Sequence, residues 1–124
     1  MRALIADDSR CSQLQLREVL KAQSIDCEEA VDAEEGLVRL RRGREFDRML
    51  VDWNMPGMSS PEMVARARQE GMGELKILMV TTAAESECIE MAMEAGADEF
   101  LMKPFGAEAF KEKLARMGLE RVAE

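Results

Sequence analysis

The sequence feature that most constrains the fold is a regular alternation of short apolar runs with longer stretches of helical periodicity. The apolar runs occupy residues 3–6, 26–31, 49–53, 76–81 and 99–102, the second being the weakest. The amphipathic stretches between and after them cover residues 10–23, 32–42, a third beginning at residue 60, 85–95 and 107–122. Alternation of this kind predicts an α/β fold: a doubly wound, five-stranded parallel (βα)5 sheet with helices on both faces.

The chain length matches this arrangement. The five strand–helix pairs use up all 124 residues, and 47% of the residues are hydrophobic, enough for a core. We therefore expect one domain over residues 1–124, with no separate output domain.

The composition excludes several kinds of chemistry. The chain has no histidine, so Ser-His-Asp catalysis, Cys-His catalysis and histidine-containing zinc sites are impossible. The three cysteines are far apart and form no redox or disulfide pattern. No segment reads as a signal peptide or a membrane span. We expect a cytoplasmic protein.

The charge argues against a nucleic-acid partner. The net charge is -8, whereas nonspecific binding to nucleic acid depends on Lys and Arg side chains. The short basic run Arg39, Arg41, Arg42 and Arg44 is more typical of a solvated helix end. We therefore expect no direct contact with nucleic acid.

Polar side chains gather where the predicted strands end. These residues are Asp7, Asp8, Asp52, Thr81, Thr82 and Lys103. The carboxyl ends of parallel strands meet at one edge of the sheet, where such folds bind ligands. Three carboxylates at close range repel one another, and Mg²⁺ is the cation that such a group typically holds together with phosphate oxygens. Phosphoryl transfer needs little beyond positioning and charge neutralisation, and an aspartate can serve as its nucleophile.

The ordered motifs resemble those of the receiver domain of two-component response regulators, and most of all the single-domain, CheY-like chemotaxis receivers. The motifs are Ala6-Asp7-Asp8-Ser9, Asp52-Trp53-Asn54-Met55-Pro56-Gly57-Met58, Val80-Thr81, Ala95-Gly96-Ala97-Asp98 and Lys103-Pro104-Phe105. The resemblance covers essentially the whole chain. It implies a flavodoxin-like sheet with strand order 2-1-3-4-5.

The resemblance also implies roles for individual residues. Asp52 is then the phosphoacceptor, with Asp8, Asp52 and the Asn54 main-chain carbonyl ligating Mg²⁺ and Asp7 acting through water. Thr81 would donate its hydroxyl to a phosphoryl oxygen. Lys103 would pair with the phosphate and be followed by a cis peptide bond.

The same resemblance implies a switch and a set of partners. Phosphorylation would move Thr81 and turn Phe100 inward, changing a face formed by the 85–95 helix, the 99–102 strand and the last helix. Ile89, Met93 and Phe100 would belong to that partner surface. The phosphodonor would be a sensor histidine kinase or a phosphotransfer protein, and the target an unknown downstream protein.

Some positions depart from the family pattern or tune the site. Asn54, Thr82 and Ala83 flank the phosphoacceptor, and the stiff Thr82 side chain predicts slower phosphorylation or dephosphorylation than a Thr82→Ala variant would show. Phe100 lacks the hydroxyl of the tyrosine often found there. Ser60 is expected to cap the helix that Pro61 enters.

Three other readings compete with a phosphorylated switch. A haloacid-dehalogenase phosphatase needs an Asp-x-Asp motif after its first strand, and a flavodoxin needs a Ser/Thr/Gly-rich loop there; Asp7-Asp8 is neither. A degenerate receiver could act as a phosphorylation-independent interaction module, but the intact set of Asp8, Asp52, Thr81 and Lys103 argues against it. We therefore expect a signalling protein that catalyses only its own phosphorylation and dephosphorylation, and no other enzymatic activity.

Overall fold

A computed structural model of the chain describes residues 2–42, 46–55, 57–82 and 89–117. Within these residues strands and helices alternate along the chain, as the sequence predicts. The elements are β1 (Arg2–Ala6), α1 (Arg10–Ala22), β2 (Asp26–Ala30), α2 (Ala33–Arg41), β3 (Arg48–Asp52), α3 (Ser60–Gln69), β4 (Lys76–Thr82), α4 (Ile89–Ala95), β5 (Glu99–Lys103) and α5 (Ala107–Arg116). The predicted start of the fourth helix at residue 85, the site-tuning residue Ala83 and the end of the last helix lie outside the described residues.

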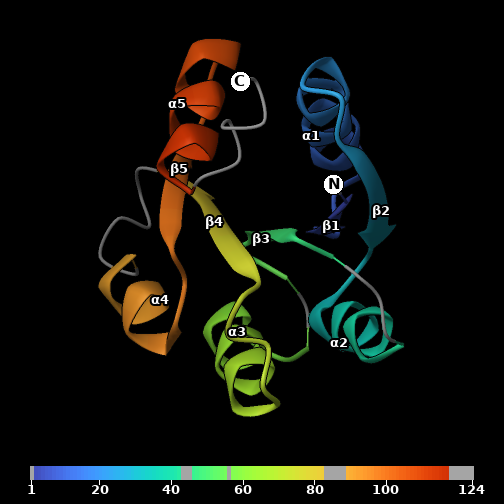
Figure 1. The fold of residues 1–124 in the computed structure, drawn as a ribbon, viewed down its shortest axis with the longest axis vertical. Coiled ribbons are helices and arrows are strands. Elements are labelled where there is room, and N and C mark those ends of the chain that lie inside the picture. The colour runs from blue at the N-terminus through green and yellow to red at the C-terminus, as the bar shows by residue number, and fades with distance from the viewer. Residues whose placement is uncertain (1, 43–45, 56, 83–88, 118–124) are drawn as a thin grey trace.

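The strands form one parallel sheet in the order β2-β1-β3-β4-β5, which confirms the predicted fold class. Helices α1 and α5 cover one face of the sheet, and α2, α3 and α4 cover the other (Figure 1). Each face encloses its own apolar core. One core joins alternate strand residues such as Leu4 and Met49 to α2, α3 and α4. The other joins Ile5 and Leu50 to α1 and α5.

The three central strands are buried on both faces, which explains their nearly continuous apolar runs. Strand β2 differs, because it lies at the edge of the sheet and carries acidic residues. The Glu28 carboxylate accepts hydrogen bonds from Arg2 and Arg39, and the Glu29 carboxylate accepts from Arg10 and Arg17. Charged side chains on an edge strand discourage pairing with other chains. The weak apolar pattern of residues 26–31 is thus a property of an edge strand.

The N-cap of the third helix lies one residue earlier than the sequence suggested. Its N-cap is Ser59, whose hydroxyl accepts a hydrogen bond from the Glu62 N–H, and Ser60 is the first helical residue. The expectation that Ser60 is the cap was therefore wrong. The buried Ser60 hydroxyl donates instead to the main-chain carbonyl of Asp52, at 2.5 Å. It ties the start of α3 to the end of β3.

Arg68 connects the end of α3 to the turn between α4 and β5. Its guanidinium donates to the carbonyls of Met72 (2.6 Å) and Leu75 (2.7 Å), and twice to the carbonyl of Gly96 (2.8 and 3.0 Å). It also donates to the Asp98 carboxylate at 2.9 Å. Gly96 has a φ of +125°, and a Cβ atom there would lie 2.7 Å from the Arg68 side chain, so this turn requires glycine.

No helix in the described parts of the chain is long and apolar enough to cross a membrane.

Candidate functional site

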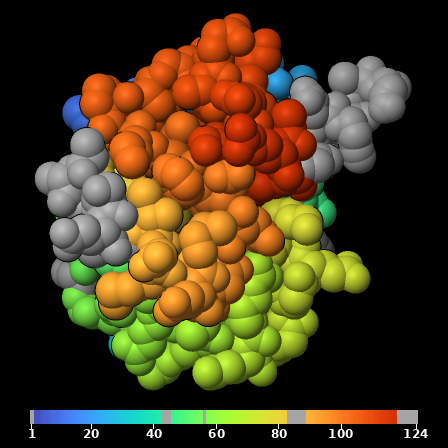
Figure 2. Space-filling view, turned by 90° about the vertical axis from the view of Figure 1, so that its left-hand side faces the viewer, coloured from blue at the N-terminus to red at the C-terminus, as the bar shows by residue number. Residues whose placement is uncertain are grey.

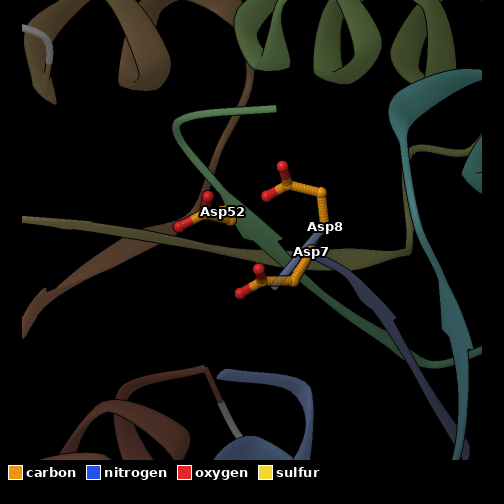
Figure 3. Close-up of side chains that lie close together, drawn as sticks. All are labelled: Asp7, Asp8 and Asp52. Carbon is orange, nitrogen blue, oxygen red and sulfur yellow. The ribbon is translucent and has the colours of Figure 1, made fainter. Parts of the chain in front are cut away.

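Three carboxylates lie together where β1 and β3 end. Asp7 and Asp8 follow β1, and Asp52 is the last residue of the adjacent strand β3. One oxygen from each carboxylate lies within 4.8 Å of the other two, and Figure 3 shows the three side chains projecting from the neighbouring strand ends. Asp7 is fully buried, Asp52 is 8% exposed and Asp8 is exposed. We call this group the acidic triad.

Lys103, at the end of β5, provides a positive charge beside the acidic triad. Its ammonium donates to Asp52 Oδ1 at 3.0 Å and lies 3.9 Å from Asp7 Oδ2. It also donates to the hydroxyl of Ser12 on α1, at 2.9 Å. The Lys103–Pro104 peptide bond is cis, as the sequence resemblance implied. Within the described residues, one ammonium therefore lies beside a group of three carboxylates.

The electrostatics of Asp52 reflect this imbalance. Burial raises the pKa of the Asp52 carboxyl above its usual value, and the nearby Asp7 and Asp8 carboxylates raise it further. The hydrogen bond from Lys103 acts in the opposite direction, but it does not cancel the effect of burial. Two unit charges at about 4–5 Å repel by roughly 3–4 kcal/mol at an effective dielectric constant of 20. The site therefore gains from an additional cation.

The donor set fits a divalent cation. Asp7 Oδ1 accepts a hydrogen bond from the Ser9 N–H at 2.9 Å, whereas the buried Asp7 Oδ2 has no hydrogen-bond partner. A buried carboxylate oxygen in this condition is costly unless a ligand satisfies it. Carboxylate oxygens are ligands that Mg²⁺ prefers, and the exposed Asp8 leaves the group open to solvent. Asn54, whose carbonyl is the fourth expected ligand, is exposed two residues after Asp52.

The remaining site residues lie on the neighbouring strand ends. Thr81 is buried near the end of β4, one residue beyond Val80, which is the register partner of Asp52. Thr82 is half-buried and pairs in register with Lys103. The sheet register thus brings Asp52, Thr81 and Lys103 to the same edge. The sequence prediction that these residue types converge is confirmed by their positions, and their individual roles are taken up below.

The expected partner surface lies to the side of this edge. Helix α4, strand β5 and helix α5 lie side by side on one face of the molecule (Figure 2). Phe100 is half-buried, and the Lys113 ammonium lies 4.4 Å from the centre of its ring. Ile89 is half-buried and Met93 is 38% exposed. Met91, which the sequence did not single out, is the more exposed of the two methionines at 55%.

Sequence reasoning missed two polar residues behind the site. Ser12 and Gln13 are buried on the face of α1 that also presents Leu16 and Leu20 to the core. The Gln13 side-chain amide donates to the Asp7 main-chain carbonyl at 2.6 Å, and Ser12 accepts from Lys103. The available signal was the position of two polar residues on the apolar stripe of an amphipathic helix.

The comparisons with known proteins agree with this geometry. The response regulator receiver domain family matches residues 3–115, and the chain belongs to this family. The chain is 35% identical over 124 residues to the chemotaxis protein CheY of Pseudomonas aeruginosa, an alignment that covers 98% of each chain.

Solved structures are also similar. The chemotaxis response regulator CheY4 of Vibrio cholerae superimposes with a TM-score of 0.84 at 32% identity, covering 94% of this chain and 97% of that one. The response regulator TrrA of Thermotoga maritima, solved in complex with Mg(2+)-BeF, gives a TM-score of 0.81 at 27% identity, with the same coverage of both chains. The family places this chain in two-component signalling, in which CheY-type receivers take phosphate from histidine kinases and bind downstream targets.

Proposed function

We propose that the protein is a signalling switch that accepts a phosphoryl group on Asp52. One observation carries this proposal: a buried carboxylate with a raised pKa stands between two further carboxylates and a lysine that donates to it at 3.0 Å. An Asp52 oxygen attacks the phosphorus of a phosphohistidine on a partner protein. The new O–P bond of an aspartyl phosphate forms as the P–N bond breaks, and the imidazole nitrogen leaves with the electron pair.

Asp8, Asp52 and the Asn54 carbonyl are the residues proposed to hold Mg²⁺, with Asp7 acting through water. Bound there, Mg²⁺ would neutralise carboxylate and phosphoryl charge. The buried Asp7 oxygen that has no hydrogen-bond partner supports this assignment.

The protein's own residues supply the rest of the chemistry. Lys103 already donates to Asp52 Oδ1, so its ammonium is in place to pair with a phosphoryl oxygen bonded to that carboxylate. Thr81 lies at the end of the next strand and would donate its hydroxyl to another phosphoryl oxygen. Asn54, Thr82 and Ala83 would tune the access of water, and with it the self-catalysed loss of phosphate.

The phosphorylation state would be read on the α4-β5-α5 face. Thr81 and Phe100 occupy neighbouring strands in a sheet that links the acidic triad to this face. A shift of Thr81 toward the phosphate would free space for Phe100, and a change at Phe100, Ile89 and Met93 would alter the surface offered to a protein target. The likeness to chemotaxis proteins extends this proposal to a role in chemotaxis.

The test is phosphorylation by a small donor. The purified protein is mixed with Mg²⁺ and acetyl phosphate, and its intact mass is measured over time. We expect a gain of one phosphoryl group that is absent in Asp52→Asn and in the absence of divalent cations. Asp26→Asn, the same change on the exposed start of β2, is the matched control and keeps the mass gain. A protein that gains no mass from acetyl phosphate or from a phosphorylated histidine kinase would instead be a phosphorylation-independent interaction module.

A further inference from the structure

The Lys103 ammonium has two kinds of acceptor, and only one of them belongs to the acidic triad. It donates to Asp52 Oδ1 at 3.0 Å and to Ser12 Oγ at 2.9 Å, while Asp7 Oδ2 lies farther away at 3.9 Å. Lysine carries three N–H donors and no acceptor. The Ser12 hydroxyl thus helps to fix the ammonium at a position that is within hydrogen-bond distance of Asp52 but 3.9 Å from Asp7 Oδ2.

Ser12 is placed for this contact by the helix that carries it. Its N–H donates to the Ser9 hydroxyl in the N-terminal cap of α1, and the residue is only 9% exposed. The residues that follow on the same helix face, Leu16 and Leu20, are packed in the core beneath α1 and α5. A serine on this apolar face of the helix contributes less to apolar packing than a hydrophobic residue would. Its hydroxyl instead accepts a hydrogen bond from Lys103, which lies 91 positions away in the sequence. Lys103 is therefore held by a hydrogen bond to Ser12 on α1 as well as by one to Asp52 on β3.

We propose that Ser12 is a positioning residue that holds the Lys103 ammonium away from Asp7, which leaves the Asp7 carboxylate available to a divalent cation. The inference rests on the proposed function, because it concerns cation binding at the acidic triad. Without the Ser12 hydroxyl, the ammonium is no longer held from α1, and the buried Asp7 Oδ2, which has no hydrogen-bond partner, is a nearby acceptor. Lys103 would then pair with Asp7 and Asp52 together and compete with Mg²⁺ for both.

Titration with Mg²⁺ tests this inference, with the fluorescence of Trp53, the neighbour of Asp52 and the sole tryptophan, as the readout. We expect Ser12→Ala to raise the Kd for Mg²⁺ about five-fold, a change that corresponds to the net strength of a typical hydrogen bond. Ser12→Thr keeps the hydroxyl and restores the affinity to within about two-fold of wild type, a difference well below the cost of losing that bond.

A double-mutant cycle separates positioning from a merely structural role. In a Lys103→Met background there is no ammonium to hold, so Ser12→Ala leaves the Kd unchanged. Ser59→Ala serves as the matched control: it removes a capping hydroxyl from α3, lowers the thermal stability and leaves the Kd unchanged in both backgrounds.

The outcomes are distinct. An equal rise in Kd with and without Lys103 would show that Ser12 acts on the fold, and no rise in the wild-type background would show that it does not act at all. Either result overturns the inference and leaves the proposed function standing. If Ser12→Ala does not fold, Ser12→Cys, which has a weaker acceptor, takes its place in the same cycle. A wild-type protein whose fluorescence and unfolding temperature ignore Mg²⁺ would overturn the inference together with the metal site.

Discussion

Two acidic regions of this molecule, the edge strand β2 and the acidic triad, treat their carboxylates in opposite ways. Glu29 on β2 is bonded to Arg10 and Arg17, and its pKa is lowered, first of all by the hydrogen bond from Arg17. The pKa of Asp52 in the acidic triad is raised, first of all by burial.

The difference lies in the supply of cations. Four arginines pair with the two glutamates of β2. Among the ion pairs of the described residues, the acidic triad has Lys103 alone, which pairs with Asp52 and Asp7. Carboxylates that are paired with arginines stabilise the fold. Partly buried carboxylates without enough cationic partners lower its stability, so they indicate a site that binds a cation from solution.

The largest expected effect concerns cation binding. Asp8→Asn should weaken Mg²⁺ binding by more than about ten-fold, since even a residue that only supports a metal ligand can cost that much. Titration of the Trp53 fluorescence measures it. Glu28→Gln, the same kind of change on β2, should leave the affinity unchanged, and an equal loss in both variants would show that total negative charge, rather than the acidic triad, attracts the cation.

The next effect is on stability without metal. Asp52→Asn removes a buried charge with a raised pKa, so we expect it to raise the free energy of unfolding by about 1 kcal/mol at neutral pH. Because the folded state favours protonated Asp52, the wild type has this stability at low pH and loses it as the pH rises through the raised pKa. The advantage of the variant should therefore shrink toward pH 4. Urea unfolding at several pH values measures it, and a destabilised variant at pH 7 would contradict the comparison.

Glu29→Gln should lower the free energy of unfolding, by less than Asp52→Asn raises it. The lowered pKa of Glu29 means that its ion pairs stabilise the fold above the usual glutamate pKa, and this contribution is lost as the pH falls through the lowered value. We expect a loss of about 0.5–1 kcal/mol at neutral pH that disappears in acid. The same urea series measures it. A loss that persists at low pH would assign the effect to packing of the side chain.

The smallest effect belongs to an exposed pair. Arg41 bonds to Glu70 at 2.6 and 2.9 Å, and this pair lowers the pKa of Glu70, but both side chains lie in solvent. Glu70→Gln should leave the unfolding midpoint within experimental error, because exposed ion pairs contribute little. A clear drop in the unfolding midpoint would mean that a short distance between the charged groups, rather than their burial, decides which ion pairs stabilise the fold.

The sequence predicted the features that depend on neighbours along the chain. Short apolar runs and helical periodicity identified the alternation of strands and helices, and the parallel sheet then brought Asp7, Asp52 and Lys103 to one edge without further assumptions. The strand order came from the family resemblance, because local patterns carry no information about which strands are adjacent.

The features that the sequence did not reveal depend on contacts between distant segments. The bond between Ser12 and Lys103 joins residues that local periodicity cannot relate. The same is true of the arginines that match the β2 glutamates, since they come from β1, α1 and α2. The cap of α3 was misplaced by one residue because Ser59 and Ser60 are chemically identical, and only the burial of Ser60 distinguishes them.

The attachment of Arg68 to the Gly96 carbonyl bears on how the α4-β5-α5 face can move. This carbonyl lies directly beyond the C-terminal end of α4, and the same guanidinium donates to two carbonyls in the segment between α3 and β4. The C-terminal end of α4 is therefore a fixed pivot. A rearrangement of α4 on phosphorylation would be a swing whose amplitude grows toward Ile89, the residue with which its described part begins. Residues near Ile89 would then report the phosphorylation state more strongly than residues near Ala95.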